Sequence, residues 1–244
     1  SGIDIHKGLG NANKIMNRLL FDGFDNFGLQ IVSIQGGGLR NAIPRESEAK
    51  VIIAQVYEDV FLYDMQQVVD DIKAELKTVE PNLEISLKKM DSLPQSVMPP
   101  IAQFYFVRAI YAAHNGVYRM NTDFDNLVET SNNIAKVSLG DGKLLVQCLT
   151  RSSVESAKMD LVNALRSTFE LMGCEVETSG SYPGWTPNAQ SEILAVAASI
   201  YEKQHSEKPK VAACHAGLEC GILGVNYPSL DMISFGPTIK GAHS

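Results

Sequence analysis

The chain has 244 residues, of which 45% are hydrophobic and 20% charged, a composition typical of a folded globular protein with one or two cores. A net charge of −7 without any Lys/Arg cluster argues against nucleic acid as a partner, because phosphate binding requires a basic surface. No apolar run is long enough to predict a membrane span or a membrane partner. The four cysteines form no CxxC pair, so we expect reduced thiols and a cytoplasmic location.

The first half of the chain alternates helical and strand patterns. The expected elements are a helix over residues 8–21, strands at 29–34 and 49–56, a helix that opens at Asp64, and a half-exposed strand at 83–87. The first strand ends in three glycines, Gly36 to Gly38. Glycine leaves the backbone free for positive φ or close approach, so these residues predict either a tight turn or a substrate-facing loop.

The second half repeats this order after a proline-rich linker. We expect a buried helix over 101–113, strands at 135–139 and 144–149 joined by a hairpin turn at 140–142, a helix over 154–172 and a strand at 174–178. Asn41-Ala-Ile-Pro and Asn132-Asn-Ile-Ala precede corresponding elements, about 91 positions apart. Two β-α-β type halves, about 8–92 and 93–184, therefore predict a ferredoxin-like antiparallel sheet with helices on one face.

Two prolines and a glycine in Tyr182-Pro-Gly-Trp-Thr-Pro187 interrupt the pattern, and we expect a domain boundary there, between 1–184 and 185–244. Beyond it we expect a helix near 193–201 and two fully apolar strands, at 211–214 and 232–235, as in a parallel sheet that is covered on both sides. Because two strands cannot form such a sheet alone, this tail should pack on structure outside this sequence.

Each of these last two strands leads into a Gly-rich segment with a histidine, His215 and His243. In open α/β sheets, ligands bind at the carboxyl ends of strands. A loop histidine at that position can be a metal ligand, a proton carrier or a hydrogen-bonding group. The pattern alone does not choose among these roles.

Several motifs, taken together and in order, resemble the aminoacyl-histidine dipeptidases, which are relatives of carnosinase with two zinc ions per site. The motifs are Gly8-Leu-Gly-Asn-Ala-Asn-Lys14, Gly36-Gly-Gly-Leu-Arg-Asn-Ala-Ile-Pro-Arg-Glu46, Arg151-Ser-Ser, Tyr182-Pro-Gly-Trp185, His215-Ala-Gly-Leu-Glu219-Cys-Gly and Ser234-Phe-Gly-Pro-Thr-Ile-Lys-Gly-Ala-His243-Ser. The resemblance covers nearly the whole chain but only part of such an enzyme. It implies a lid or dimerisation domain, 1–184, followed by a C-terminal fragment of an α/β zinc-peptidase catalytic domain, 185–244.

The resemblance also implies an activity, the hydrolysis of Xaa-His dipeptides by metal-activated water. His243 would be a ligand of zinc or another divalent metal, and Arg151 would bind the carboxylate of the dipeptide. Asn41 would donate its amide to the oxyanion. His215 and Glu219 would line the substrate pocket. By residue type alone, an exposed loop histidine, a helix-entry arginine and a turn asparagine fit the first three positions as well.

The family also has parts that this sequence lacks. An N-terminal catalytic half should supply the remaining metal ligands and a glutamate general base, and Gly-Gly-His should precede Ser1. With His243 alone from the metal ligands, the chain should be inactive by itself. We expect the missing half and a second copy of the chain, in a homodimer, as its partners.

Two other functions remain open from the sequence. The chain could be a non-catalytic binding or dimerisation module whose sheet edge pairs with a copy of itself. It could also be a cysteine-dependent amidohydrolase that uses Cys220. The apolar surroundings of Cys214 and Cys220 argue against the amidohydrolase, because buried thiols are usually inert.

Overall fold

The computed structural model describes residues 2–90, 94, 96–122, 124–186, 188, 190–211 and 219–236. The chain forms two compact units, and each is built from several stretches of sequence. The first comprises residues 1–116, 132–149 and 163–176, and the second comprises 117–131, 150–162 and 177–244. Within the described residues, no helix is both long and apolar enough to cross a membrane.

The five strands belong to one sheet, in the order β2-β1-β4-β3, with β5 also paired to β4. Their bounds are β1 Gln30–Gly37, β2 Ser47–Ile52, β3 Gly116–Met120, β4 Val128–Gly140 and β5 Lys143–Ser152. β1 pairs antiparallel with both β2 and β4, and Ile34 lies opposite Leu139. Asp141 and Gly142 join β4 to β5 with φ of 50° and 72°, as a two-residue hairpin requires. The predicted antiparallel sheet and this hairpin are therefore confirmed.

Helix α1 (Ala12–Phe27) has clear signals at both ends. The Asn11 side chain caps it by accepting hydrogen bonds from the backbone N–H groups of Asn13 and Lys14. It ends at Gly28, whose φ of 63° is the left-handed conformation that glycine adopts at little cost. A short 3-10 helix, η1 (Gly2–Lys7), precedes it.

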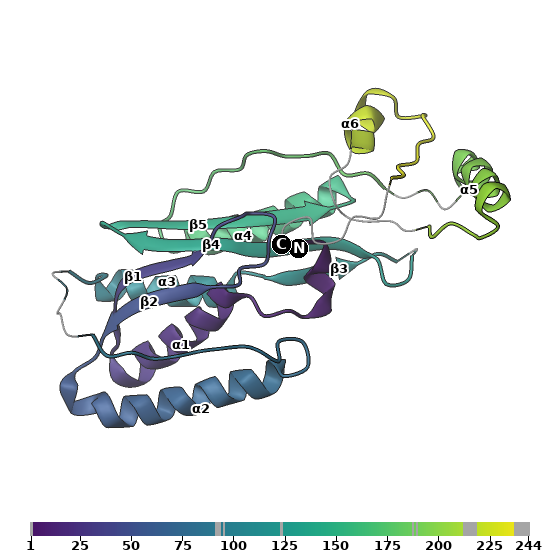
Figure 1. Ribbon diagram of the computed structural model, residues 1–244. Coiled ribbons are helices and arrows are strands. Elements are labelled where there is room, and N and C mark those ends of the chain that lie inside the picture. The colour runs from purple at the N-terminus through teal and green to yellow at the C-terminus, as the bar shows by residue number, and fades with distance from the viewer. Residues whose placement is uncertain are drawn as a thin grey trace. The chain divides into compact units, whose positions relative to one another are not determined.

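The core of the first unit lies where helices meet the sheet. α1 contacts α2 (Glu58–Leu76), α3 (Pro100–Ala112), β1 and β2, and it lies between α2 and the β1–β2 pair (Figure 1). One face of α2 is buried, with Met65, Val69 and Ile72 each 1% exposed, and the helix begins at Glu58 rather than at Asp64 as expected. Burial of each such side chain contributes about 1.5–3 kcal/mol, so this packing accounts for much of the stability of the unit.

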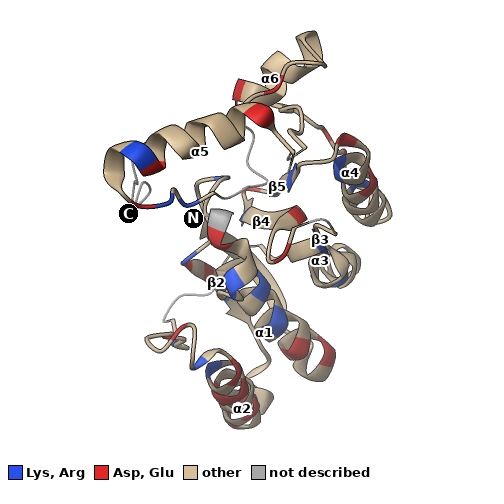
Figure 2. Cartoon of the chain, turned by 90° about the vertical axis from the view of Figure 1, so that its right-hand side faces the viewer, with Lys and Arg blue, Asp and Glu red and all other residues tan. Residues whose placement is uncertain are grey.

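The surface of α2 is acidic. This helix, which follows the 3-10 turn η2 (Gln55–Tyr57), carries six Asp or Glu residues and one lysine, and its red segments are visible in Figure 2. A helix of this charge repels phosphate backbones, in agreement with the negative net charge of the sequence.

The second unit contains the beginning of α4 (Glu155–Glu170), together with α5 (Glu192–His205) and α6 (Glu219–Asn226). Ser191 caps α5, with its hydroxyl accepting from the Leu194 N–H at 3.1 Å. The Asp231 carboxylate reinforces this start, because it accepts from the Ile193 N–H at 3.0 Å and from the Ser191 hydroxyl at 2.9 Å.

Three expected strands are wrong. Residues 83–87, 174–178 and 232–235 are all described, and none of them is in a strand. Alternation at 83–87 and 174–178, and the apolar run at 232–235, indicate which side chains are suited to burial, but a strand also requires a hydrogen-bonded neighbour. The remaining expected strand, at 211–214, lies almost entirely outside the described residues.

Candidate functional site

Asn41 lies in the loop that connects β1 to β2, and backbone hydrogen bonds close this loop at its base. The Gly37 N–H donates to the Glu46 carbonyl at 3.0 Å, and the Ala12 N–H at the start of α1 donates to the Pro44 carbonyl at 3.1 Å. The loop is therefore attached both to its own hairpin and to α1.

The two peptide carbonyls that flank Asn41 are held from β4. The Asn133 side-chain amide donates to the Ala42 carbonyl at 2.7 Å and to the Arg40 carbonyl at 3.4 Å. The Asn133 side-chain oxygen in turn accepts from the Asn11 amide at 3.1 Å. Asn11 and Asn133 are each 4% exposed, so this connection is shielded from water.

The glycines that precede this loop are required by packing. A Cβ at Gly37, where φ is 71°, would collide with the Ala135 carbonyl of β4. A Cβ at Gly36 would collide with the side chains of Asn13 and Ser47, whereas one at Gly38 would meet open space. Close approach of other chain segments thus explains Gly36 and Gly37.

Arg151 is half-buried near the carboxyl end of β5, in a stretch that is held by its neighbours. The Ser152 hydroxyl lies 2.8 Å from that of Thr130, and the Ser153 N–H donates to the Glu129 carbonyl at 3.1 Å. The buried Glu129 carboxylate lies 3.5 Å from the Arg119 guanidinium. The strand end that carries Arg151 is consequently rigid.

The segment 181–186 docks on this same strand end. The Lys158 ammonium donates to the Tyr182 carbonyl at 2.7 Å and to the Ser181 hydroxyl at 3.1 Å. The Thr186 hydroxyl donates to the Ser153 carbonyl at 3.3 Å. A Cβ at Gly184 would lie 2.5 Å from that carbonyl oxygen, so only glycine allows the approach.

Helix α6 packs on segment 181–186 in turn. A Cβ at Gly221 would lie 2.6 Å from the Pro183 carbonyl oxygen, which makes glycine necessary there as well. Glu219 is exposed and is the first residue of α6. The end of β5, segment 181–186 and the start of α6 therefore form one continuous stack in the second unit.

The expected metal site is outside the described part of the chain. His215 and His243 both lie outside the described residues. Among the residues that the structure does describe, no group of three or more His, Cys, Asp or Glu side chains could hold a metal ion. Asn41 belongs to the first unit, and Arg151 and Glu219 belong to the second.

The cysteines whose pKa is perturbed are poor nucleophiles. Burial raises the pKa of the half-buried Cys148 thiol to about 11, against the opposing effect of a hydrogen bond from Asn132. Burial also raises the pKa of Cys174. Both thiols are therefore protonated at neutral pH. Cys220 is half-buried and lines an apolar groove, as its apolar sequence neighbours predicted.

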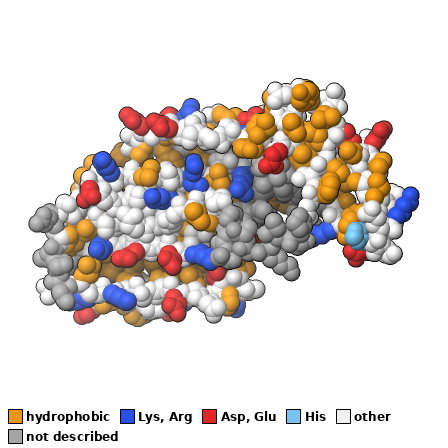
Figure 3. All heavy atoms as spheres, turned by 45° about the horizontal axis from the view of Figure 1, so that its top comes forward, with side chains coloured by type: hydrophobic (Ala, Val, Ile, Leu, Met, Phe, Trp, Pro, Cys, Tyr) orange, Lys and Arg blue, Asp and Glu red, His pale blue; other side chains and the backbone are white. Residues whose placement is uncertain are grey.

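This groove is an open hollow of about 450 Å³ between α5, α6 and residues 230–235. Figure 3 shows hydrophobic side chains gathered over α5 and α6. Its walls include Val196 and Ile200 of α5, Leu223 of α6, and Met232. Val196 and Ile200 are 59% and 50% exposed, which is unusual for a cluster of large apolar residues.

Comparisons with known proteins identify relatives. Residues 1–84 match the M20_dimer family, described as a peptidase dimerisation domain. The chain is 38% identical over 246 residues to the cytosol non-specific dipeptidase of Escherichia coli (strain K12), and the match covers 100% of this chain and 50% of that protein. A solved structure, the aminoacylhistidine dipeptidase from Vibrio alginolyticus, matches with 38% identity and a TM-score of 0.91, over 99% of this chain and 49% of that one.

The chain thus spans about half the length of these relatives. The resemblance to the aminoacyl-histidine dipeptidases, inferred from motifs along the sequence, is confirmed for that half.

Proposed function

We propose that this chain is one part of a zinc-dependent cytoplasmic dipeptidase that hydrolyses Xaa-His dipeptides by metal-activated water. The observation that carries the proposal is the 38% identity to two dipeptidases along the whole chain. We assign residues 1–184 to a lid or dimerisation domain and residues 185–244 to a C-terminal segment of the catalytic domain. On its own, this chain would be inactive.

The described residues do not fit a zinc site by themselves, because they contain no suitable group of three ligands. In the proposal, His243 is one ligand, and the part of a longer polypeptide that this chain lacks supplies the others. Zinc or another divalent metal held there would polarise the scissile carbonyl and supply the attacking hydroxide.

The residues of this chain would bind and orient the substrate. The Arg151 guanidinium would hold the dipeptide carboxylate with two parallel hydrogen bonds, and the rigid end of β5 supports such a role. The Asn41 amide would donate a hydrogen bond to the oxyanion. Removal of a donor of this kind lowers kcat by about 10²–10³-fold. His215 and Glu219 would line the substrate pocket.

The apolar groove of the second unit supports the proposal that a missing catalytic half packs on this unit. A longer polypeptide is expected because both relatives are about twice as long as this chain. Covering Val196, Ile200 and Leu223 would remove their exposed apolar surface from water, which contributes about 25 cal/mol per Å². We assign this groove to contact with the missing half.

The first unit supports a homodimer. Residues 1–84 match a peptidase dimerisation domain, and they include β2, which ends the strand order of the sheet, and α2. An apolar stripe runs at helical spacing from η2 into the first turns of α2. It consists of Val56, Val60 and Tyr63, which are 81%, 56% and 66% exposed. A second copy of the chain would cover this apolar stripe.

The same family match favours a second candidate function, a non-catalytic dimerisation module. Calorimetric zinc titration and assays on Xaa-His dipeptides, performed on this chain and on a protein that also contains the missing half, distinguish the two. The dipeptidase proposal expects about two zinc ions bound by the longer protein and tight binding of none by this chain.

In the longer protein, Arg151→Ala should lower kcat/KM for dipeptides by about 10²-fold or more, because a buried charged hydrogen bond to the substrate is lost. If the longer protein neither binds zinc nor cleaves dipeptides, the dimerisation module is the better account. If Arg151→Ala leaves kcat/KM unchanged, the role proposed for Arg151 is wrong.

A further inference from the structure

We infer that Asn133 is a positioning residue, whose side-chain amide fixes the peptide segment that carries Asn41 and so sets the direction of the Asn41 side chain. The inference rests on the proposed role of Asn41 as the oxyanion donor. It assigns a function to a residue of β4 that the motifs of the sequence do not distinguish from its neighbours.

The Asn133 amide and the two carbonyls that it binds, those of Arg40 and Ala42, form a clamp around Asn41. An amide nitrogen carries two hydrogens, and in Asn133 both have acceptors, the carbonyls of Ala42 at 2.7 Å and of Arg40 at 3.4 Å. These carbonyls belong to the residues on either side of Asn41. The backbone on both sides of Asn41 is therefore held from one point on the sheet.

The orientation of the Asn133 amide is unambiguous. Its oxygen accepts from the Asn11 amide at 3.1 Å. If the amide were reversed, its NH₂ group would face that of Asn11, and its oxygen would face two carbonyl oxygens. The donor side of Asn133 must consequently face the loop.

The clamp is anchored in regular structure on both sides. Asn133 is part of β4, and the Asn11 oxygen accepts from the first N–H groups of α1 at Asn13 and Lys14. Asn11 also donates to the Asn115 side-chain oxygen at 2.9 Å. Because Asn11 and Asn133 are buried between α1 and β4, the donor that holds the loop is itself fixed in place.

Catalysis by an oxyanion donor depends on this kind of support. The donor stabilises developing charge only if it already points at the oxyanion, and a displacement of about 1 Å costs about 10²-fold in rate. Loss of the clamp should therefore affect the transition state more than substrate binding.

The test compares two adjacent asparagines in the longer dipeptidase that contains this chain. Asn133→Ser removes the amide that forms the clamp and leaves a small polar side chain in its place. Asn132→Ser is the matched control, because Asn132 is 1% exposed in the same strand and donates to the His114 carbonyl at 2.7 Å. We expect Asn133→Ser to lower kcat by about 10- to 100-fold and to change KM by less than about twofold. Asn132→Ser should leave both kcat and KM within about twofold of the wild type.

Hydrogen exchange supplies a readout that does not depend on activity. The amides of residues 39–46 should exchange faster in Asn133→Ser and at the wild-type rate in Asn132→Ser. Unchanged exchange in Asn133→Ser would overturn the clamp. Asn41→Ala isolates the proposed function: if that variant keeps full activity, the role of Asn41 is wrong. If Asn41→Ala loses activity while Asn133→Ser does not, the positioning role of Asn133 is wrong.

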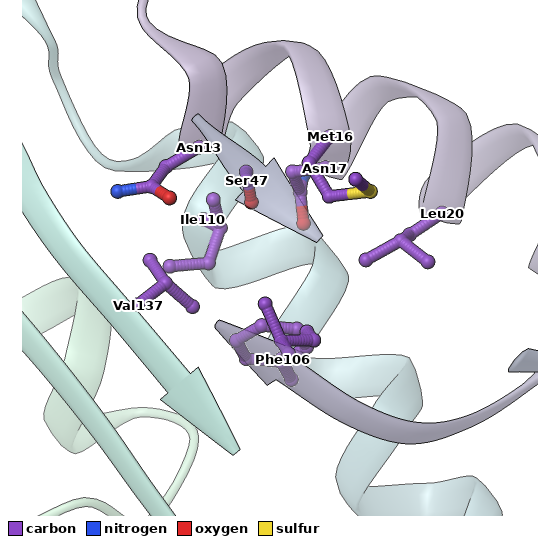
Figure 4. Close-up of a pocket in the computed structure, with 9 residues that line it drawn as sticks. Asn13, Met16, Asn17, Leu20, Ser47, Phe106, Ile110 and Val137 are labelled. Atoms are coloured by element: carbon purple, nitrogen blue, oxygen red, sulfur yellow. The ribbon is translucent and has the colours of Figure 1, made fainter. Parts of the chain in front are cut away.

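A separate observation carries a second inference, in a small cavity of the first unit. The cavity has a volume of about 10 Å³ and lies between α1, β1, β2, α3 and β4 (Figure 4). Three buried polar atoms on its lining residues have no hydrogen-bond partner within the described chain, the side-chain oxygens of Asn13, Asn17 and Ser47. Asn13 and Asn17 are each 3% exposed.

The amide groups are fixed on their other sides. The Asn17 NH₂ group donates to the Val107 carbonyl at 2.9 Å, and that of Asn13 donates to the Ile134 carbonyl at 3.2 Å. Reversal would place oxygen against oxygen, so the Asn13 and Asn17 oxygens are the atoms left for the cavity.

We propose that this cavity binds one ordered water molecule. A water molecule would donate a hydrogen bond to each amide oxygen and accept one from the Ser47 hydroxyl, and the volume suffices for one.

A crystal structure at atomic resolution tests this proposal. We expect one density peak within hydrogen-bond distance of all three oxygens, unchanged when sodium replaces potassium in the crystals. Water relaxation dispersion should also detect one fewer long-lived internal water in Ser47→Ala. Absence of the peak, or metal-like distances to these oxygens, would overturn the proposal.

Discussion

The ammonium nitrogen of Lys158 lies 2.7 Å from the carbonyl oxygen of Tyr182, and the Lys158 side chain is 8% exposed. A buried ammonium is normally avoided, and here it joins the first turns of α4 to segment 181–186. Because that segment contacts both the end of β5 and α6, Lys158 stabilises the surroundings of Arg151.

Lys158→Met should therefore destabilise the second unit by about 2 kcal/mol, because hydrogen bonds to a buried charge are lost while the apolar stem is kept. The amides of residues 181–186 should also exchange faster. Urea unfolding and hydrogen exchange measure the two effects. Lys89→Met is the control: the Lys89 side chain is 75% exposed and forms an ion pair with Glu58 at 2.6 Å, so its loss should cost less than about 1 kcal/mol.

Gly37→Ala should destabilise the first unit by at least about 2 kcal/mol, because it forces a side chain into positive φ and against the Ala135 carbonyl. Gly38→Ala, one residue further, should change the free energy of unfolding by less than about 0.5 kcal/mol. Denaturant titration of the two variants measures the difference. Equal effects would show that the approach of β1 to β4 at Gly37 is not tight.

The raised pKa of the Cys148 thiol predicts that the folded chain loses stability at alkaline pH. Its pKa is raised from 9.0 to about 11 in the folded chain, so the unfolded chain loses this proton first as pH rises. The stabilisation is fully present below about pH 9 and disappears as pH approaches about 11. The free energy of unfolding of the wild type should fall more steeply in this range than that of Cys148→Ser. Parallel pH profiles would contradict the raised pKa.

The lowered pKa of the Asp231 carboxyl predicts that the folded chain loses stability at acid pH. Hydrogen bonds from the Ile193 N–H and the Ser191 hydroxyl lower the pKa of this carboxyl below 3.8, so its contribution is present above that pH and lost as pH falls through the lowered pKa. Relative to Asp231→Asn, the wild type should lose stability below about pH 4 and keep a constant advantage above about pH 5. Circular dichroism at a series of pH values measures the difference, which would be flat if Asp231 did not cap α5.

The sequence was sufficient for elements with a strong local pattern. Local patterns predicted the helix α2, apart from its start at Glu58, and the hairpin turn at 140–142, because each depends on residues that are close in the chain. The three wrong strands depended on distant partners, which neither alternation nor an apolar run reveals.

The surroundings of the candidate site were harder to predict. The sequence places Asn11 in the expected helix over 8–21 and Asn133 just before the expected strand at 135–139, but the structure buries them as a hydrogen-bonded pair with a separation of 122 positions. Lys158 resembles a surface lysine on a helix and is buried. Nothing local indicates such contacts. The roles of Asn41, Arg151, His215, Glu219 and His243 came from family motifs and stay predictions.

The pairing of β1 with β4 sets the order in which this protein can fold as it is synthesised. β1 can pair with β4 only after both strands have been synthesised. Because Ile34 lies opposite Leu139, more than 100 residues must leave the ribosome between the two. Until then, β1 has only the β2 hairpin on one side and an open edge on the other. An open strand edge of this kind can pair with another chain until β4 covers it.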